Sequence, residues 1–411
     1  MTPSNSVTSL RTVEFVPLVA LLMSLVALSV DAMLPALPVI GRDLGTQHPN
    51  EAQYVITALF IGLGIGQLFF GPLSDAIGRR PAIVAGLVVF IVGCLASVFA
   101  SSFEMMIVGR VLQGLGASSP RIVTMALVRD QYSGVQMARI LSFIMAVFIL
   151  VPAVAPLLGQ TIMWLGGWRS IFTTFLIVAV TVLIWFLSRH PETLRPADRR
   201  PLSPKLIGEA VGDFLTVRSS VAYTFAIGLV CSPFVAFLNS AQQIFQDAYS
   251  TGSYFPLYFG ILALAIGFGS LANDRLLLHY GMHQIVRSAA FAATAVSFVA
   301  LVVLVAFDGL PPLWLYMAYM LPLFVSMGAL FGNLNALAMQ PLGHIAGVGA
   351  ALVASIATFI SVSFGTLIGQ TFDGTVYFLV GSFALFGLLT VIAIHWANRP
   401  GSNSKPFTGA T

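Results

Sequence analysis

Apolar runs of about 20 residues recur along almost the whole of this 411-residue chain. A run of about 20 apolar residues crosses the hydrocarbon core of a bilayer as a helix. Only 8% of the residues are charged and 58% are hydrophobic, which excludes a soluble protein. The pattern predicts an all-α integral membrane protein with twelve transmembrane helices, near residues 14–38, 53–73, 81–101, 104–128, 138–162, 169–189, 218–243, 254–272, 284–307, 312–335, 346–370 and 375–397.

The distribution of basic residues predicts the orientation, because lysine and arginine resist translocation. With the N-terminus inside, fifteen of the 19 basic residues fall at inner connections or termini, and only Arg42 and Arg169 at outer ones. We expect both termini to be cytoplasmic and the chain to lie in the inner membrane of a bacterial cell. No removed signal peptide is expected, since the first apolar run continues through Asp31 without a small-residue cleavage site. The role of lysine and arginine in orienting the helices explains the net charge of +4, so no nucleic-acid partner is expected.

One long connection, residues 190–217, divides the chain into two halves and holds four prolines with clustered charge. We predict an N-terminal six-helix bundle over 1–189, a cytoplasmic linker over 190–217, and a C-terminal six-helix bundle with a short tail over 218–411. Two motifs of the first half return in the second: 71–75 matches 269–273, and 158–161 matches 368–371. Internal repeats of this kind place a transport site at the midplane, between the halves.

The segment at 66–81, GQLFFGPLSDAIGRRP, resembles the signature between spans two and three of the major facilitator superfamily. Three further segments are similar to those of twelve-span drug:proton antiporters, in the bicyclomycin and chloramphenicol resistance branch. They are DAMLPALP at 31–38, GRVLQGLG at 109–116 and VRD at 128–130. The resemblance is weak in the second half, where Asn273 takes the place of Asp75 and Leu276 that of Gly78. It implies two six-helix bundles in the major facilitator fold, and proton-coupled efflux of small lipophilic compounds or antibiotics by alternating access.

The loop of this signature has two interpretations. Asp75 can pair with Arg79, Arg80 or Arg129, and exposed ion pairs of an anchoring loop contribute only ~0–1 kcal/mol. The resemblance implies instead a latch that favours the outward-open state. The residues of this latch are Gly71, Asp75, Gly78, Arg79, Arg80 and Arg129.

Span five carries Pro152, Pro156 and Gly159 in a stretch that resembles the antiporter motif of the same family. It departs from the motif, because Ala155 and Gln160 occupy positions where the pattern has glycine. Each proline removes a backbone donor, so we expect this helix to bend and to pack closely through Ala155 and Gly159. A kinked packing helix without a direct role in coupling is the alternative.

Three ionisable residues fall inside predicted spans, although such a residue at mid-membrane costs ~2.5–3.5 kcal/mol. Asp31 and Arg110 each lie about six residues, or ~9 Å, from the outer ends of their spans, which predicts that they pair. Arg121 lies on nearly the same stripe of span four as Arg110 and is expected to be a charge in the cavity. Asp31 with Arg110 is the candidate for proton coupling, and a purely structural ion pair is the alternative.

Polar residues also share faces of the second, fourth, seventh and tenth spans, and aromatic residues accompany them. A drug-sized pocket needs an apolar and aromatic lining with few polar anchors. For each uncharged polar residue, the alternative is a hydrogen bond between helices. The candidates for the substrate cavity are Met33, Gln53, Thr57, Phe60, Gln113, Phe148, Asn239, Gln243, Tyr319 and Asn333.

Other function classes lack their sequence signals. The strings His-Glu-x-x-His and Gly-x-Ser-x-Gly do not occur, so an enzyme is not expected, and a Walker-type loop for ATP is also missing. The two cysteines, Cys94 and Cys231, give no support for a disulfide framework or a metal site, and no cofactor is expected. The expected partners are a small lipophilic substrate, protons and the lipid bilayer, and the chain is expected to be a monomer. The alternative function is proton-coupled export of one endogenous metabolite, such as a siderophore, a sugar or an amino-acid derivative.

The predicted orientation is tested with reporter fusions. A reporter fused after residue 200 should behave as cytoplasmic, and one fused within 41–50 as periplasmic, because basic residues stay on the cytoplasmic side. The reverse behaviour at either position would overturn the arrangement of six plus six spans.

Overall fold

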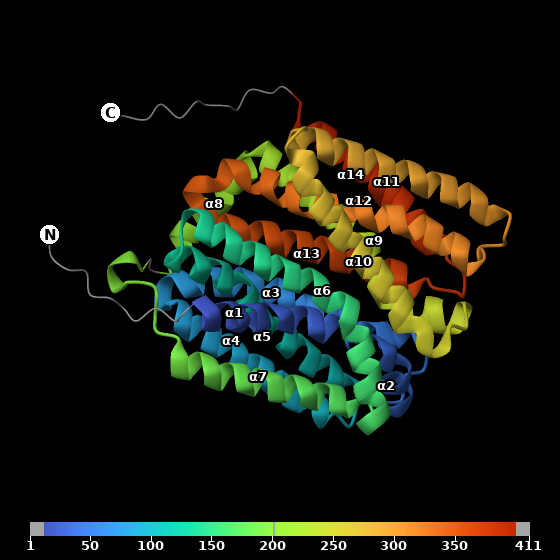
Figure 1. Cartoon of the computed structure of the whole chain (residues 1–411), viewed down its shortest axis with the longest axis horizontal. Helices are drawn as coiled ribbons and strands as arrows, with labels where there is room; N and C mark the ends of the chain where they lie inside the picture. The colour runs from blue at the N-terminus through green and yellow to red at the C-terminus, as the bar shows by residue number, and fades with distance from the viewer. Residues whose placement is uncertain (1–11, 200–201, 400–411) are drawn as a thin grey trace.

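The computed structural model describes residues 12–199 and 202–399, which form a bundle of long helices (Figure 1). No strand occurs in these two ranges, so the predicted all-α class is confirmed. The helices of membrane-spanning length are α1 (Thr12–Asp31), α3 (Tyr54–Ile77), α4 (Arg79–Val98), α5 (Phe103–Gln131), α6 (Gly134–Gly166), α7 (Arg169–Arg189), α9 (Arg218–Gln242), α10 (Phe255–Leu277), α11 (Met282–Val305), α12 (Leu313–Met339), α13 (Ala346–Gln370) and α14 (Tyr377–Ala397).

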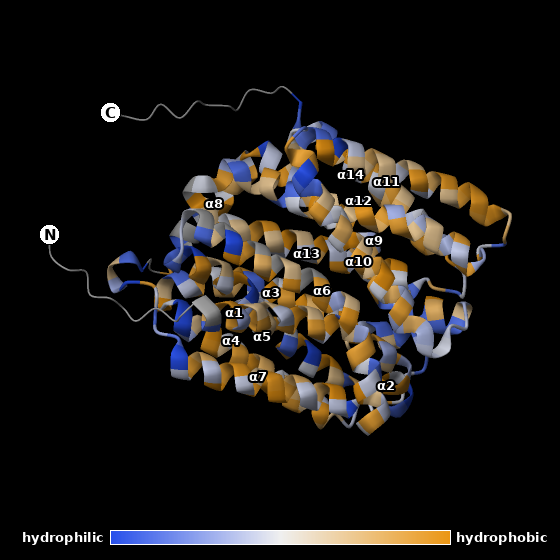
Figure 2. Cartoon of the chain, viewed as in Figure 1, coloured by the Kyte–Doolittle hydropathy of each residue, from blue (hydrophilic) through white to orange (hydrophobic). Residues whose placement is uncertain are grey.

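The composition of these helices fits a membrane, because hydrophobic residues run along them and hydrophilic ones gather toward their ends (Figure 2). Ten stretches of the described chain are long and apolar enough to cross a bilayer. The other two long helices are α5, which is diluted by charged residues, and α6, whose apolar part is Leu150–Gly166. Together they complete the predicted set of twelve.

The helices are arranged so that Thr12 and Arg399, the ends of the described chain, lie at the same end of the bundle (Figure 1). We call it the terminal end, and the opposite end, where α2 (Leu37–Asp43) lies, the distal end. The helices form two six-helix bundles, α1 with α3–α7 and α9–α14. Two seams join the bundles: α3 packs on α13, and α6 packs on α10. Between these seams lie α1 and α5 of the first half and α9 and α12 of the second.

Small residues set the close packing inside the first half. A Cβ atom at Gly62 of α3 would lie 2.0 Å from the carbonyl oxygen of Val111, and one at Gly114 of α5 would lie 1.9 Å from that of Leu59. Glycine is therefore required at both positions for α3 and α5 to approach at this distance. Apolar side chains give little drive for association between helices in lipid, so such backbone contact is a main source of attraction.

The first predicted span, 14–38, is not one continuous helix. The helix α1 ends at Asp31, and the chain continues through the 3₁₀ turn η1 (Leu34–Ala36) into α2. Pro35 and Pro38 lack the backbone N–H that an unbroken α-helix needs, which explains the interruption. Asp31 consequently lies at the break between two helices and not six residues inside one.

The linker contains a helix that was not predicted from the sequence, α8 (Pro204–Thr216), which packs against α9 and α13. Its buried residues Ala210 and Phe214 are four positions apart, so they lie on one face. This spacing was the available signal, and the prolines of the linker obscured it.

Candidate functional site

The deepest charge in the first half is Arg110 of α5, which has no exposed surface. Its Nε atom donates to the carbonyl oxygen of Val55 (3.0 Å), Nη2 to that of Ser29 (2.7 Å), and Nη1 to Oε1 of Gln113 (2.6 Å). The ring of Phe172 covers the guanidinium, with 5.7 Å from Cζ to the ring centroid. Arg110 thus ties α1, α3 and α5 together through backbone carbonyl groups.

The predicted pair between Asp31 and Arg110 is wrong for this structure. Among the described residues there are three ion pairs, and neither residue takes part in them. The donors of Arg110 are engaged by carbonyl and amide oxygens, which leaves Asp31 without a cationic partner. Asp31 is nevertheless 95% buried at the end of α1.

The helix α6 packs directly on the break at Asp31. A Cβ atom at Gly159 would lie 1.6 Å from the carbonyl oxygen of Ala32, so only glycine permits this contact. Ala155 is fully buried, as expected for close packing, and α6 is helical through Pro152 and Pro156. The antiporter-like segment therefore holds the backbone next to the one carboxyl group at this depth.

A ring of four side-chain amides joins the two halves at the distal end. Nε2 of Gln53 donates to Oε1 of Gln243 (2.6 Å), and Nε2 of Gln243 donates to Oδ1 of Asn50 (2.7 Å). The ring closes through Gln370 of α13, whose Nε2 donates to the backbone oxygen of Asn50 (2.8 Å) and to Oε1 of Gln53 (3.3 Å). We call Asn50, Gln53, Gln243 and Gln370 the amide ring.

Beyond the amide ring lies a depression of about 680 Å³ that the ring itself helps to line. Its wall includes three carboxylates, Glu51, Asp247 and Asp373. Hydrogen bonds from Thr375 lower the pKa of Asp373 below its ordinary value, so this carboxylate is charged at neutral pH. The distal face is therefore acidic.

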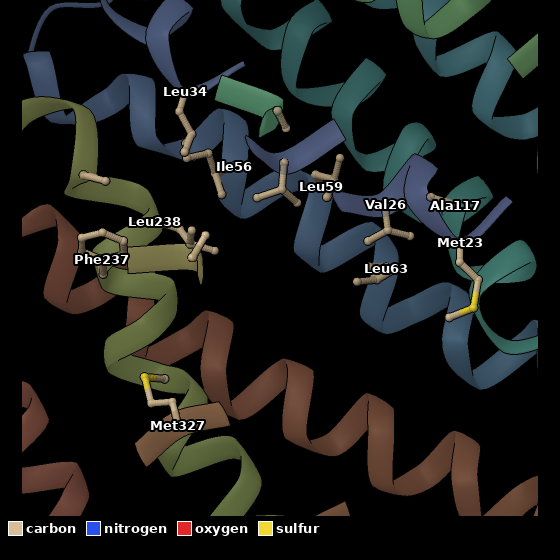
Figure 3. Close-up of a cluster of buried hydrophobic side chains, with 14 of the residues drawn as sticks. Met23, Val26, Leu34, Ile56, Leu59, Leu63, Ala117, Phe237, Leu238 and Met327 are labelled. Atoms are coloured by element: carbon tan, nitrogen blue, oxygen red, sulfur yellow. The ribbon is translucent and has the colours of Figure 1, made fainter. Parts of the chain in front are cut away.

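An apolar layer lies next to the amide ring. Leu34 and Ile56 of the first half and Phe237 and Leu238 of α9 are buried where η1 and α9 make contact (Figure 3). The distal end is thus closed by one polar and one apolar layer.

Hydrogen bonds along the α3–α13 seam continue from the amide ring toward the terminal end. The hydroxyls of Thr57 and Thr366 are 2.9 Å apart, and Oγ of Ser355 donates to the carbonyl oxygen of Gly64 (2.6 Å). Each bond is between neutral groups. Such bonds contribute about 0.5–1.5 kcal/mol each, so water can replace them at small cost.

Ion pairs connect α3, α4 and α5 at the terminal end of the first half. Arg79 is 5% exposed and binds two carboxylates, Oδ1 of Asp75 at 2.5 Å and Oδ2 of Asp130 at 3.0 Å. The predicted partner Arg129 is exposed and takes part in none of the three ion pairs of the described residues. Arg80 donates to the carbonyl oxygen of Leu187 (2.7 Å).

Asp75 also reaches the second half. A Cβ atom at Gly347, in the first turn of α13, would lie 2.9 Å from Oδ2 of Asp75. A carboxylate near a helix N-terminus is stabilised by the helix dipole. Gly71 contributes to the same approach, because its own Cβ position is 3.4 Å from Ala351 of α13. Asp75 therefore interacts with Arg79 in its own half and with the start of α13 in the other.

Glu192 of the linker has a role that was not predicted from the sequence. Its carboxylate accepts hydrogen bonds from the backbone N–H groups of Arg79 (2.9 Å) and Arg80 (3.1 Å) and so caps α4. Gly78 precedes them with φ of 114°, and a Cβ atom there would lie 2.4 Å from Oε2 of Glu192. This position needs glycine for its left-handed backbone and for the carboxylate beside it. No local pattern links residues so far apart in the chain.

The start of the linker is fixed to the first half by His190. Its ring stacks on Phe186, with centroids 5.0 Å apart, and Nε2 lies 3.0 Å from Nε2 of Gln131. Burial lowers the pKa of His190 below its ordinary value. The linker thus begins against the first half, and its helix α8 packs against the second.

Arg121 differs from the other two arginines inside the first half. It is partly exposed, and no hydrogen bond or ion pair joins it to another described residue. Cys231 of α9, which is also partly exposed, lies within electrostatic range of its guanidinium. Arg121 of α5 and Cys231 of α9 come from helices that lie between the two seams, and both side chains are partly exposed. We call the region between these helices the central cavity.

Several predicted cavity residues form hydrogen bonds between helices instead. Gln113 donates to Gly93 and Ser97 of α4, Tyr319 meets Ser297 of α11 at 3.2 Å, and Asn333 donates to Asn273 of α10 at 2.6 Å. Gln53, Thr57 and Gln243 belong to the distal closure described above. For these six residues, the alternative interpretation is the correct one in this conformation.

The remaining candidates have different surroundings. Met33 is fully buried in the core of the first half, and Phe60 is partly exposed. Asn239 is buried, and both polar atoms of its side chain lack a hydrogen-bond partner. The side chain of Phe148 lies outside the part of the chain that the structure describes.

The fold and this site define a transporter of the major facilitator superfamily, whose family model matches residues 19–366. The chain belongs to this superfamily. It is 29% identical to the uncharacterized MFS-type transporter YdgK of Bacillus subtilis, over 90% of this chain and 94% of that protein. It is 26% identical to a bicyclomycin resistance protein homolog of Haemophilus influenzae, over 95% and 98% of the two chains. A chloramphenicol resistance protein of Pseudomonas aeruginosa is 31% identical over 64% of this chain and 62% of its own.

These relatives place the chain in the drug-efflux branch of the superfamily, as the motifs of the first half predicted. Among solved structures, the human organic anion transporter MFSD10 superposes with a TM-score of 0.70 over 95% of this chain and 100% of its own. The sequence identity is 16%, so this similarity concerns the fold alone.

The contacts of Asp75 predict the effect of removing its charge. Asp75→Asn should lower transport roughly tenfold while the protein stays in the membrane, because a charge-assisted hydrogen bond worth about 1.5–3 kcal/mol is lost in one conformation. Transport and the accessibility of introduced distal cysteines would be measured together. Asp274→Asn, which removes an exposed carboxylate near the end of α10, the corresponding position of the second half, is the matched control. Unchanged accessibility in Asp75→Asn would leave the loop as an anchor and not a latch.

Proposed function

We propose that this protein exports small lipophilic compounds, including antibiotics, in exchange for protons. The similarity to resistance proteins supports the substrate class. The observation that carries the proton-coupled mechanism is Asp31, a buried carboxyl group without a cationic partner at the closed distal end. The central cavity is the proposed substrate site.

The proposed orientation places the terminal end in the cytoplasm of a bacterial cell, with the protein in the inner membrane. Arg79 and Arg80 at the start of α4 and Arg189 at the end of α7 lie at that end, whereas the distal depression is lined by carboxylates. This distribution follows the rule that positive charge stays inside. The conformation described is then closed toward the periplasm.

Transport proceeds by rocking of residues 1–189 against residues 218–411, with the linker 190–217 between them. The α3–α13 and α6–α10 seams act as the flexible joints. Opening the distal end exchanges the hydrogen bonds of the amide ring for bonds with water, and closing the terminal end brings α5 and α12 together. Repeat-built transporters alternate access to a central site in this way.

Asp31 is the proposed proton carrier. When the distal end opens, water from the acidic exterior reaches the carboxylate, and one of its oxygen atoms takes up a proton. Arg110 stays bound to the carbonyl groups of Val55 and Ser29 and need not be released, in contrast to an ion-pair exchange. When the cavity opens to the cytoplasm and substrate enters, the proton leaves Asp31 to water on that side. When the distal end opens again, the substrate leaves to the exterior.

The driving force is sufficient for accumulation against a gradient. One charge moving through the membrane field supplies ~2.3 kcal/mol per 100 mV, and each pH unit adds ~1.4 kcal/mol. Together these values support more than tenfold accumulation for one proton per substrate.

A resistance screen tests the proposed function. The chain would be expressed in a bacterium that lacks its major efflux pumps, and phenicols, bicyclomycin, quinolones and lipophilic cations would be tested. Protection against several unrelated compounds supports drug efflux. Protection against none, with a normal amount of protein in the membrane, favours export of a single endogenous metabolite.

We predict that Asp31→Asn still binds substrate but loses uphill efflux, because the amide cannot take up the proton. Proton release on adding substrate to the solubilised protein should also disappear. Asp308→Asn is the control, since Asp308 is exposed, has a positive φ that asparagine tolerates, and is not part of the site. If proton release and active efflux persist in Asp31→Asn, another group carries the proton. Glu14, which lies 3.5 Å from Arg189 at the terminal end, is the next candidate.

A further inference from the structure

Arg79 of α4 and Arg110 and Arg121 of α5 are at least partly buried, and their surroundings differ in one respect. Arg79 binds two carboxylates, and Arg110 binds two carbonyl groups and an amide. Arg121 has no hydrogen-bonding or ionic partner among the described residues. An unsatisfied guanidinium inside a membrane protein is costly, and such groups mark substrate or ion pathways.

The position of Arg121 fits a substrate contact. Arg121 is ten residues from the terminal end of α5, or ~15 Å along the helix, so it lies near mid-membrane. Cys231 of the facing helix α9 lies within electrostatic range of it, and both residues are partly exposed. A group of the substrate placed between the two halves can therefore reach it.

The charge inside the bundle is positive. Arg110 and Arg121 are eleven residues apart on α5, and no carboxylate neutralises either one. Asp31 is the one carboxylic acid within the depth that these two arginines span, and it pairs with neither. A cavity of low dielectric with an uncompensated cation attracts anions and repels cations.

The opposite wall offers a surface for an aromatic body. Phe234 lies one turn from Cys231 on α9 and is partly exposed. Its ring forms a T-shaped pair with Phe331 of α12, which is also partly exposed, with centroids 6.0 Å apart. A lipophilic ring with one negative group would place the ring on this pair and the charge on Arg121.

We propose that Arg121 binds the anionic group of the substrate, and that this protein exports amphiphilic organic monoanions such as aryl carboxylates. This inference rests on the proposed efflux function and specifies its substrate class. The inside-negative membrane potential then assists export directly, by about fifty-fold in concentration for each 100 mV. The membrane potential does not assist the export of lipophilic cations, and the positive charge of Arg121 repels them.

The first test measures the electrostatic potential at Cys231 without any transport. In full-length Cys94→Ser protein in detergent, Cys231 would be modified with the anionic sulfonatoethyl or the cationic trimethylammonioethyl methanethiosulfonate. The anionic-to-cationic rate ratio should fall about tenfold in Arg121→Gln and be retained in Arg121→Lys. Arg139→Gln, which removes an exposed charge from α6, should leave it unchanged. An equal ratio in parent and Arg121→Gln, or no reaction with either reagent, would overturn the anion site.

The second test measures efflux of nalidixate and of its uncharged methyl ester from cells lacking their major pumps. The parent should export nalidixate at least tenfold better than Arg121→Gln does, while export of the ester changes little. Arg121→Lys should restore most of the nalidixate export. If the parent exports chloramphenicol but nalidixate no better than its ester, efflux stands and the anion inference fails. If no compound is exported but the reagent ratio behaves as described, the anion site stands and the efflux function fails.

Discussion

The requirement that buried polar groups find partners inside the protein governs this structure, because lipid offers none. Arg110 meets it with backbone carbonyl groups of α1 and α3 and the amide of Gln113, not with a carboxylate. This choice has two effects. The distal part of the first half becomes one rigid unit, and Asp31 stays free of an ion pair at the break in α1. A carboxyl group that is buried but not bound to a cation is suited to exchange a proton with whichever side supplies water.

The bonds between the two halves are of a different kind from those within the first half. At the distal end they are amide and hydroxyl contacts between neutral groups, such as Gln53 with Gln243 and Thr57 with Thr366. Inside the first half, Arg79 binds two carboxylates, and charge-assisted bonds are roughly twice as strong. Weak bonds across the seams and strong bonds within a half are what rocking of rigid bodies requires. Asp75 is the exception, since it contributes to both.

The sequence alone predicted the architecture well, because the length of an apolar run and the position of arginines are local properties. It predicted the loop signature and the close packing at Gly159 for the same reason. It failed where a partner comes from elsewhere in the chain. Asp31 and Arg110 lie at similar depth, but depth alone does not predict the direction of each side chain. Arg110 donates to backbone carbonyl groups instead of to Asp31. Asn50 and Gln370 of the amide ring, and Glu192 below Gly78, were missed because no spacing rule connects residues more than a hundred positions apart. Most residues of the predicted polar faces form hydrogen bonds between helices.

The central claim is that the two halves rock, with the amide ring as the distal gate. Distances between spin labels at Gln47 and Asp308 report the distal end, and distances between labels at Gln136 and Leu278 report the terminal end, all four positions being exposed. The measurement compares the parent with the double variant Gln53→Ala, Gln243→Ala, both with Cys94 and Cys231 replaced by serine. The account predicts that removing the two amides lengthens the distal distance and shortens the terminal one in the same molecules. Distances that stay unchanged, or that lengthen at both ends together, would contradict it.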